Sequence, residues 1–330
     1  MTFDWLEWSN PVALWWSFLV AVSLLNIALL LGLRACYRVN PFGAPKAIFS
    51  IEPLALLSAV YVFGCAFRSI LPRADVQRIC LFNTWLSSVL VGRWIATAAE
   101  LCFAIQWAIV LHELGRIAHS DTAKNISRLI VPLIALAEAC SWYAVISTNF
   151  LGNVVENSLW TVTFTLVAVA LVRLAGSFRG VARLIIASTA VGAAGYVLFM
   201  STVDVPMYVL RWQAEIADGR RALGFFAGLQ DLAGRWIVTH SITQWHHEIL
   251  WMSLYFSVAV WASLMLGSFG LSGISCPLPG TPSIVENYRT PVGCAHRFVL
   301  NFEVKTKRAA IACLGSPPAS PTGRRRHPWR

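Results

Sequence analysis

One glutamate lies near the middle of a long apolar stretch, where a charge is costly. Glu138 belongs to the run 128–149, and Ser141 and Trp142 follow it by three and four residues. In a helix these spacings place the three side chains on one face. A charged side chain at the centre of a bilayer costs about 2.5–3.5 kcal/mol on insertion scales. Glu138 is therefore interpreted as a proton carrier, a cation ligand or a catalytic carboxylate, or else as a neutral carboxyl group hydrogen-bonded to a neighbouring helix.

A second polar group lies on one face of the apolar run 90–114. Arg93, Thr97 and Glu100 are spaced by four and three residues, so they share a helical face. Seven residues at about 1.5 Å each separate Arg93 from Glu100 by about 10 Å along the axis. We interpret this separation as too large for direct pairing. The two residues are expected to flank a cavity or to pair with other helices, and a structural ion network is the favoured interpretation.

Histidines form a third cluster of residues that can do chemistry. His246 and His247 are adjacent, and His240 precedes them by six and seven residues. Metal ligands on one helix are usually three or four residues apart, as in HExxH, and these histidines do not have that spacing. A zinc ion at His246 and His247 would need further ligands, such as Asp204 or Glu156. The alternative is that the histidines lie at the membrane interface in contact with water.

The composition indicates which elements must position these residues. The chain is 57% hydrophobic and 13% charged, and its mean hydropathy is +0.62. Soluble domains contain roughly 45–50% apolar and about 25% charged residues. The sequence therefore predicts an integral membrane protein with an all-α fold, a polytopic bundle of transmembrane helices.

Seven apolar runs are long enough to cross a bilayer, which takes about 20 residues. They are 11–33, 47–67, 90–114, 128–149, 156–176, 183–203 and 247–270. The third run belongs to a longer apolar stretch, 81–114, which exceeds one span. We expect an interfacial or re-entrant piece over 81–91, broken near Gly92, and an eighth span is the alternative. The long segment 204–246 mixes apolar and charged residues and is predicted to form one or two interfacial amphipathic helices.

Basic residues in the loops predict the orientation, because loops rich in Lys and Arg stay on the cytoplasmic side. The loops after the first, third and fifth runs are basic, whereas the first ten residues carry no Lys or Arg. This pattern predicts the N-terminus outside and the C-terminus inside. Three arginines of the loop after the second run count against it: Arg68, Arg73 and Arg78.

Most of the positive charge belongs to the C-terminal tail. Residues 1–272 are expected to form the transmembrane domain, and residues 273–330 a basic tail rich in Pro, Gly and Ser. The tail carries nine basic and two acidic residues, or +7 of the net +10. We expect it to be disordered and to contact anionic lipid. The expected partner is the lipid bilayer, and no nucleic-acid-binding domain is predicted.

The predicted topology brings several polar residues to one side of the membrane. Glu138 lies deeper, and eight other polar residues fall at the outer ends of their runs: Arg68, Arg93, Glu100, Glu156, Asn157, Asp204, His246 and Glu248. Together these residues are predicted to line a binding cavity that is open to the outer side.

Three functions remain open on the sequence alone. The first is a protein that binds or moves a small solute or lipid through an outward-facing polar cavity. The second is an intramembrane, lipid-modifying enzyme that uses histidines and carboxylates. The third is a scaffold or accessory subunit whose polar residues only hold helices together. The chain contains no Walker motif, no GxSxG and no HExxH, so no motif decides among them.

Overall fold

The computed structural model describes residues 10–39 and 51–268. The tail predicted over 273–330 lies outside the described residues, together with its expected disorder and its expected contact with lipid.

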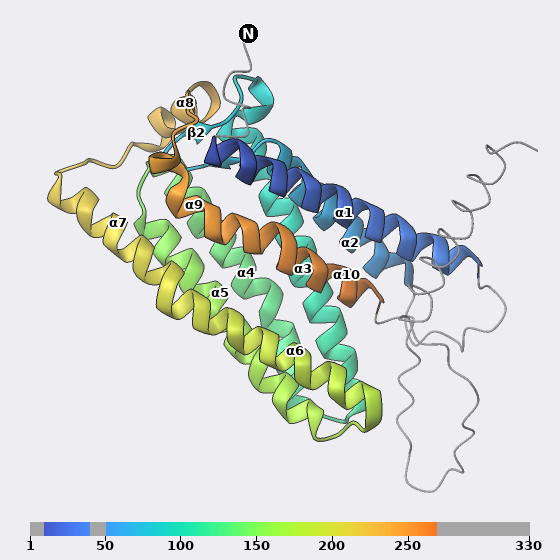
Figure 1. Cartoon of the computed structure of the whole chain (residues 1–330). Coiled ribbons are helices and arrows are strands. Elements are labelled where there is room, and N and C mark those ends of the chain that lie inside the picture. Colours follow the sequence, from blue (N-terminus) through green and yellow to red (C-terminus); the bar gives the residue numbers. More distant parts are fainter. Residues whose placement is uncertain (1–9, 40–50, 269–330) are drawn as a thin grey trace, which may run out of the picture. The chain divides into compact units, whose positions relative to one another are not determined.

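Helices make up most of the described chain (Figure 1). The elements are α1 (Pro11–Val39), α2 (Ile51–Ile70), β1 (Arg73–Ala74), β2 (Ile79–Cys80), η2 (Trp85–Ser87), α3 (Val89–Ile117), α4 (Asp121–Ser147), α5 (Leu151–Ala175), α6 (Gly180–Phe199), η3 (Met200–Asp204), α7 (Val205–Ala217), α8 (Phe225–Gly234), β3 (Ile237–Val238), α9 (Ile242–Leu254), η4 (Tyr255–Ala259) and α10 (Val260–Ser268). The segments η3 and η4 are π-helical, and η2 is a 3₁₀-helix.

Seven helices within the described residues are long and apolar enough to cross a membrane. Two of them are composite, because a π-helical turn joins their parts without ending the helix. One runs from Gly180 to Ala217 through η3, and the other from Ile242 to Ser268 through η4. The helix that contains the predicted sixth span therefore does not end near residue 203 but continues to Ala217. The first of the predicted amphipathic helices, α7, continues α6, whereas α8 is a separate short helix.

Neighbouring helices in the chain pack against one another from α1 to α6. The chain then returns, and α9, η4 and α10 pack on α1, α2 and α3. In Figure 1 the orange α9–α10 lies between the blue α1 and the yellow α6–α7. Close packing of α4 on α5 depends on Gly152, where an added Cβ would lie 2.5 Å from the carbonyl oxygen of Cys140.

The third membrane-length helix begins three residues before the predicted break. Ser88 precedes α3, and its Oγ accepts a hydrogen bond from the Val91 backbone N–H at 3.4 Å. Such a serine satisfies one of the free N–H groups of the first turn. The expected break near Gly92 is therefore wrong, because the hydrogen bond of Ser88 fixes the start of the helix at Val89. Residues 81–88 form turns and η2, with no eighth span.

Residues 71–88 and 218–241, here named the cap, cover one end of the bundle. Strand β2 pairs antiparallel with β1 and parallel with β3, so the two parts of the cap are joined by a small sheet. These short strands are the exception to the predicted all-α fold. Arg78 holds the cap on the bundle: its Nε lies 2.9 Å from Asp231 Oδ2, and its Nη2 donates to the carbonyl oxygen of Val145 at 2.7 Å.

Candidate functional site

A cavity of about 690 Å³ extends from the cap into the bundle. Its walls come from α2, α3 and α5 on one side and from α6, η3, η4 and α10 on the other. Charged side chains gather where the cavity meets the cap, and aromatic side chains line the part further from it. The two ends therefore offer different chemistry to a bound molecule.

Arg93 is the centre of the charged end. Its Nη2 lies 2.7 Å from Glu138 Oε2 and 3.2 Å from Glu100 Oε2. Its Nη1 lies 3.9 Å from both Asp75 Oδ2 and Glu156 Oε1. One guanidinium thus contacts carboxylates from α3, α4, α5 and the cap. All four predicted site residues named here are buried, with 3–7% of their surface exposed.

The prediction that Arg93 and Glu100 are too far apart to pair is wrong. The estimate of 10 Å measured the rise of the backbone and left out the length of the two side chains. Side chains two turns apart on one face can reach toward each other along the helix surface, and here they close the distance to 3.2 Å. Pairing of Arg93 with Glu138 on the neighbouring helix agrees with the expected ion network.

Hydrogen bonds fix the carboxylates around Arg93. Thr97 Oγ1 donates to Glu138 Oε2 at 2.6 Å and accepts from the indole N–H of Trp142 at 3.1 Å. Glu100 Oε1 accepts from the hydroxyl of Tyr255 at 2.9 Å. These contacts connect α3 with α4 and with the first residue of η4. Glu100 is therefore held in a fixed position in the wall of the cavity. Glu138, which was also predicted to line the cavity, lies behind this wall.

A second charged pair closes the cap side. Both terminal nitrogens of Arg211 donate to Glu248 Oε1 at 3.0 and 3.1 Å, and Gln77 donates to the same oxygen. The indole N–H of Trp251 donates to Glu248 Oε2 at 2.6 Å. Asp204 lies in the same region of the wall and is only 7% exposed. No hydrogen bond or ion pair of its side chain occurs within the described chain.

The Arg73 guanidinium lies on the first turn of α3 because Gly92 has no side chain. A Cβ at Gly92 would overlap the Arg73 guanidinium. Arg73 Nη1 donates to the carbonyl oxygen of Ser88 at 2.6 Å. Burial lowers the pKa of Arg73 to about 10, and the nearby Asp75 carboxylate acts in the opposite direction. Even so, Arg73 is charged at neutral pH and contributes a cation to the cap side of the cavity.

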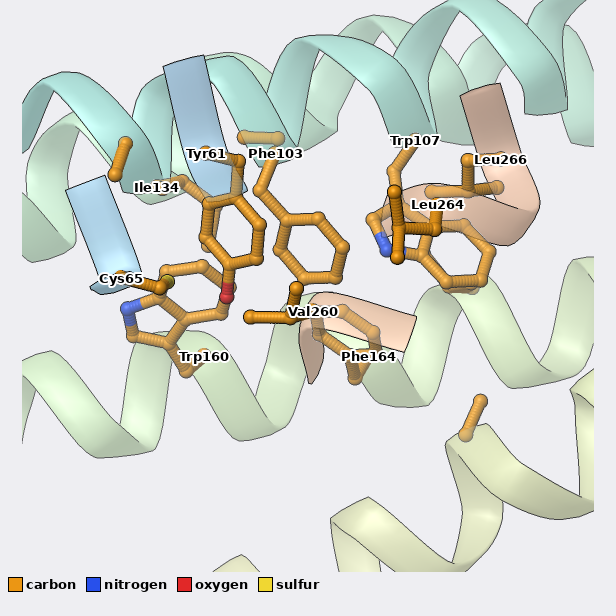
Figure 2. Packing of buried hydrophobic residues seen from close by; sticks show 14 of the residues in the cluster. Tyr61, Cys65, Phe103, Trp107, Ile134, Trp160, Phe164, Val260, Leu264 and Leu266 are labelled. Carbon is orange, nitrogen blue, oxygen red and sulfur yellow. The ribbon is translucent and has the colours of Figure 1, made fainter. Parts of the chain in front are cut away.

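Aromatic rings form the apolar wall of the cavity (Figure 2). Tyr61 of α2 stacks on Phe103 of α3, with ring centroids 4.7 Å apart. Phe164 of α5 stacks on Trp160 at 6.0 Å and meets Trp107 edge-on at 5.6 Å. Figure 2 shows these rings converging from three helices. An apolar chain placed beside them would be removed from water.

The cavity reaches the surface between α6 and α10. On the α6 side, Ser188 and Gly192 line the cavity and are exposed. Val258 and Trp261 line it on the other side and are 52% and 45% exposed. Helix α6 packs mainly on α5. The four residues named here, called the lateral mouth below, therefore frame an opening on the side of the bundle.

Both π-helical segments lie in the wall of the cavity. Met200 and Asp204 of η3 line it, as do Tyr255 and Ala259 of η4. A π-helical turn inserts an extra residue and is often found at functional sites. Asn26 of α1 contacts the irregular turn of η4: its Nδ2 donates to the Phe256 carbonyl oxygen at 2.8 Å. Both composite helices therefore have an irregular turn whose residues line the same cavity.

One group of carboxylates within the described residues has the spacing of a metal site. Oxygen atoms of Glu100, Glu138 and Glu156 lie within 4.8 Å of one another. Carboxylate oxygens suit Mg²⁺, Ca²⁺ or Mn²⁺ better than zinc. The Arg93 guanidinium, however, already lies among the three, at 2.7–3.9 Å. The chain therefore supplies its own cation, and a metal ion would be repelled by it.

The predicted zinc ligands His246 and His247 lie elsewhere. Both are exposed at the start of α9, with ring centroids 3.6 Å apart, and neither lines the cavity. Their neighbour Glu248 points to the cavity wall and pairs with Arg211. His240 binds the Leu81 carbonyl oxygen at 2.9 Å. The two expected additional ligands, Asp204 and Glu156, lie in the cavity wall, so the structure does not bring them to the histidines.

Sequence reasoning missed residues whose role depends on the fold. Asp75 is not among the predicted site residues, and Arg73 is predicted only as a charge of a loop. Tyr255 and the aromatic wall have the same sequence signature as ordinary core residues. Arg211 and Glu248 are separated by 37 residues, and a pairing at that distance leaves no periodic signal.

No protein-family model matches this chain, and no curated protein and no solved structure is significantly similar to it.

Proposed function

We propose that this protein binds an amphipathic molecule of the bilayer in the cavity between α3, α5, α6 and α10. The observation that carries the proposal is the division of one cavity into a charged end and an aromatic end. A membrane lipid has the same division, with a polar headgroup and a hydrocarbon chain. The headgroup would lie beside Arg93 and its carboxylates, and the chain beside Phe103 and Phe164.

The lateral mouth supports a ligand that arrives from the membrane. Its residues belong to two apolar helices of membrane-spanning length, and within a bilayer the medium around such helices is hydrocarbon. A lipid can enter there without leaving the bilayer. The cavity volume of about 690 Å³ also falls in the range of about 300–1,000 Å³ that is typical of ligand pockets.

The two alternatives account for less of the geometry. The enzyme interpretation relies on His246 and His247, which are exposed and outside the cavity wall. The scaffold interpretation accounts for the ion pairs of Arg93. It gives no reason for a large cavity, or for a buried carboxylate, Asp204, that has no partner among the described residues. Ligand binding is therefore the better-supported function.

The test compares the lipid retained by full-length protein and by a variant with a filled mouth. At Gly192 an added Cβ would have no atom within 4 Å, so Gly192→Trp can fill the opening without a clash at the backbone. Gly32 of α1 has the same free space and does not line the cavity, so Gly32→Trp is the matched control. Each protein is purified in mild detergent, and its lipid is extracted and quantified by mass spectrometry.

We expect the unaltered protein and Gly32→Trp to retain one lipid class in roughly equimolar amount. Gly192→Trp should retain at least about tenfold less, equivalent to about 1.4 kcal/mol of binding free energy. The same lipid content in all three proteins would overturn the proposal.

A further inference from the structure

We propose that the headgroup bound in this cavity carries a protonated amine and that Asp204 is its counter-ion. This inference rests on the proposed binding of an amphiphile and adds the chemical class of the ligand.

The charges that line the cavity do not balance. Three guanidinium groups face five carboxylates, which gives a formal charge of −2 when all are ionised. The carboxylates are those of Asp75, Glu100, Glu156, Asp204 and Glu248, and the cations are Arg68, Arg73 and Arg93. Glu138 and Arg211, which lie behind this wall, cancel each other. The chain therefore leaves room for positive charge from a ligand.

Asp204 is the carboxylate that lacks a partner. Glu100 lies 3.6 Å from Arg68 and 3.2 Å from Arg93, and Asp75 and Glu156 each lie 3.9 Å from Arg93. Glu248 pairs with Arg211 at 3.0 Å. Asp204 is as buried as these residues, at 7% exposure, yet within the described chain its carboxylate has no hydrogen bond and no cation within ion-pair distance. One of the two unmatched negative charges is thus located at η3.

An ammonium group fits this position better than a metal ion or a neutral headgroup. Burying an unpaired ion costs several kcal/mol, and a charge-assisted hydrogen bond from N⁺–H to carboxylate offsets that cost. Ca²⁺ takes 6–8 oxygen ligands, whereas Asp204 is a single carboxylate whose acidic neighbour Glu248 is already bound to Arg211. A neutral hydroxyl would leave the charge of −2 unchanged. Adjacent aromatic rings such as Tyr208 and Tyr196, which also line the cavity, add a favourable surface for a cation.

The test uses two probes with the same chain and different headgroups. Octadecylamine is protonated at neutral pH, since its amine resembles that of Lys, with a pKa near 10.4. Octadecanol is its neutral counterpart. Both are titrated against full-length protein in detergent, and bound probe is measured by native mass spectrometry. The variants are Asp204→Asn, Asp204→Glu and, as the control, Asp218→Asn at the exposed end of α7.

We expect octadecylamine to bind at least about tenfold more tightly than octadecanol. Asp204→Asn should remove this preference and leave octadecanol binding unchanged. Asp204→Glu should retain the preference because it keeps the charge, and Asp218→Asn should behave as the unaltered protein. The Asp204→Glu result keeps the test decisive if Asp204→Asn fails to fold.

Failure of this inference is distinguishable from failure of the proposed function. If both probes bind equally, and Gly192→Trp blocks both, the cavity binds amphiphiles and the ammonium assignment is overturned. The same conclusion follows if Asp204→Asn keeps the preference for the amine. If neither probe binds to the unaltered protein, the proposed function fails together with the inference.

Discussion

At the scale of single residues, Arg93 is the group on which the charged end of the cavity depends. Its guanidinium lies within 2.7–3.9 Å of four carboxylates, from α3, α4, α5 and the cap. Without it, Glu138 and Glu156 would have no cation within ion-pair distance in the described chain, and Glu100 would keep only Arg68 at 3.6 Å. Breaking a buried ion pair by removing one partner costs about 3–5 kcal/mol. Arg93 is therefore expected to be essential for stability, whatever the cavity binds.

We expect Arg93→Met to lower the thermal unfolding midpoint in detergent strongly, because it leaves uncompensated carboxylates in the bundle. Adding Glu138→Gln to this variant should recover part of the loss, since it removes one of those charges. Arg116→Met is the control, because Arg116 lies on the same helix and its side chain is 58% exposed. A double variant no more stable than Arg93→Met would contradict this account of the network.

The sequence indicated which charged residues belong to this network, but not which of them pair with each other. Glu138, Arg93, Glu100 and Glu156 stood out because charges are rare in apolar runs. Which of them pair could not be read from the sequence, because a long side chain reaches two helical turns and a neighbouring helix equally well. Asp75 and Tyr255 gave no signal, since one lies in a loop and the other resembles a core residue.

At the scale of elements, the start of α3 depends on a contact between the cap and the helix. Arg73 reaches over Gly92 and donates to the Ser88 carbonyl oxygen. Because Arg73 ends in a flexible group, a side chain at Gly92 would displace the guanidinium rather than the backbone. The glycine and the arginine therefore form one unit, in which either change removes the same hydrogen bond.

Gly92→Ala and Arg73→Ala should each lower the free energy of unfolding, by about 1.5–3 kcal/mol for a hydrogen bond from a charged group. The double variant should cost no more than the larger single effect, because both changes remove one contact. The three unfolding midpoints, measured with the unaltered protein, complete a double-mutant cycle. Additive losses would show that Gly92 and Arg73 act independently.

Hydropathy was sufficient to predict seven apolar helices, because length and composition alone set that signal. It was not sufficient for their ends. The start at Val89 depends on Ser88, and the length of the sixth helix depends on η3, which continues the chain where polar residues had suggested an end. A π-helical turn is stabilised by packing and by contacts such as that of Asn26 with Phe256, so it leaves no pattern in the local sequence.

At the scale of the whole molecule, the buried state of three arginines bears on the sidedness of the membrane. Arg68, Arg73 and Arg78 counted against the prediction that the cap end faces outside. In the structure all three are buried, with 6%, 1% and 0% of their surface exposed. Side chains that are enclosed and either ion-paired, as Arg68 is, or hydrogen-bonded, as Arg73 and Arg78 are, differ from the free loop charges on which the orientation rule rests. We therefore keep the prediction that the cap lies outside.

Two exposed aspartates at opposite ends of the bundle allow this orientation to be measured. Asp218 follows α7 at the cap end, and Asp121 begins α4 at the other end. Each is changed to Cys in a protein whose native cysteines are replaced by Ser. A membrane-impermeant maleimide added to intact cells should label Asp218→Cys and leave Asp121→Cys unlabelled until the membrane is opened. The reverse labelling would invert the predicted topology.

The apolar half of the cavity was not predictable from the sequence. Phe103, Trp107, Trp160 and Phe164 lie in apolar runs and read as ordinary helix packing. The space beside them exists because α6 packs mainly on α5 and stands apart from α10. Only the arrangement of whole helices shows that these rings have an unfilled side.

Because of the lateral mouth, the ligand concentration that controls occupancy is the concentration in the bilayer and not the concentration in water. A ligand that arrives through the side of the bundle is drawn from a two-dimensional solvent, so occupancy follows its mole fraction among the surrounding lipids. Adding buffer at a constant lipid composition should leave occupancy unchanged, whereas adding inert lipid or detergent should reduce it. In such a system the bilayer is the reservoir that sets saturation, and an affinity quoted per volume of water describes the partitioning of the ligand as much as the protein.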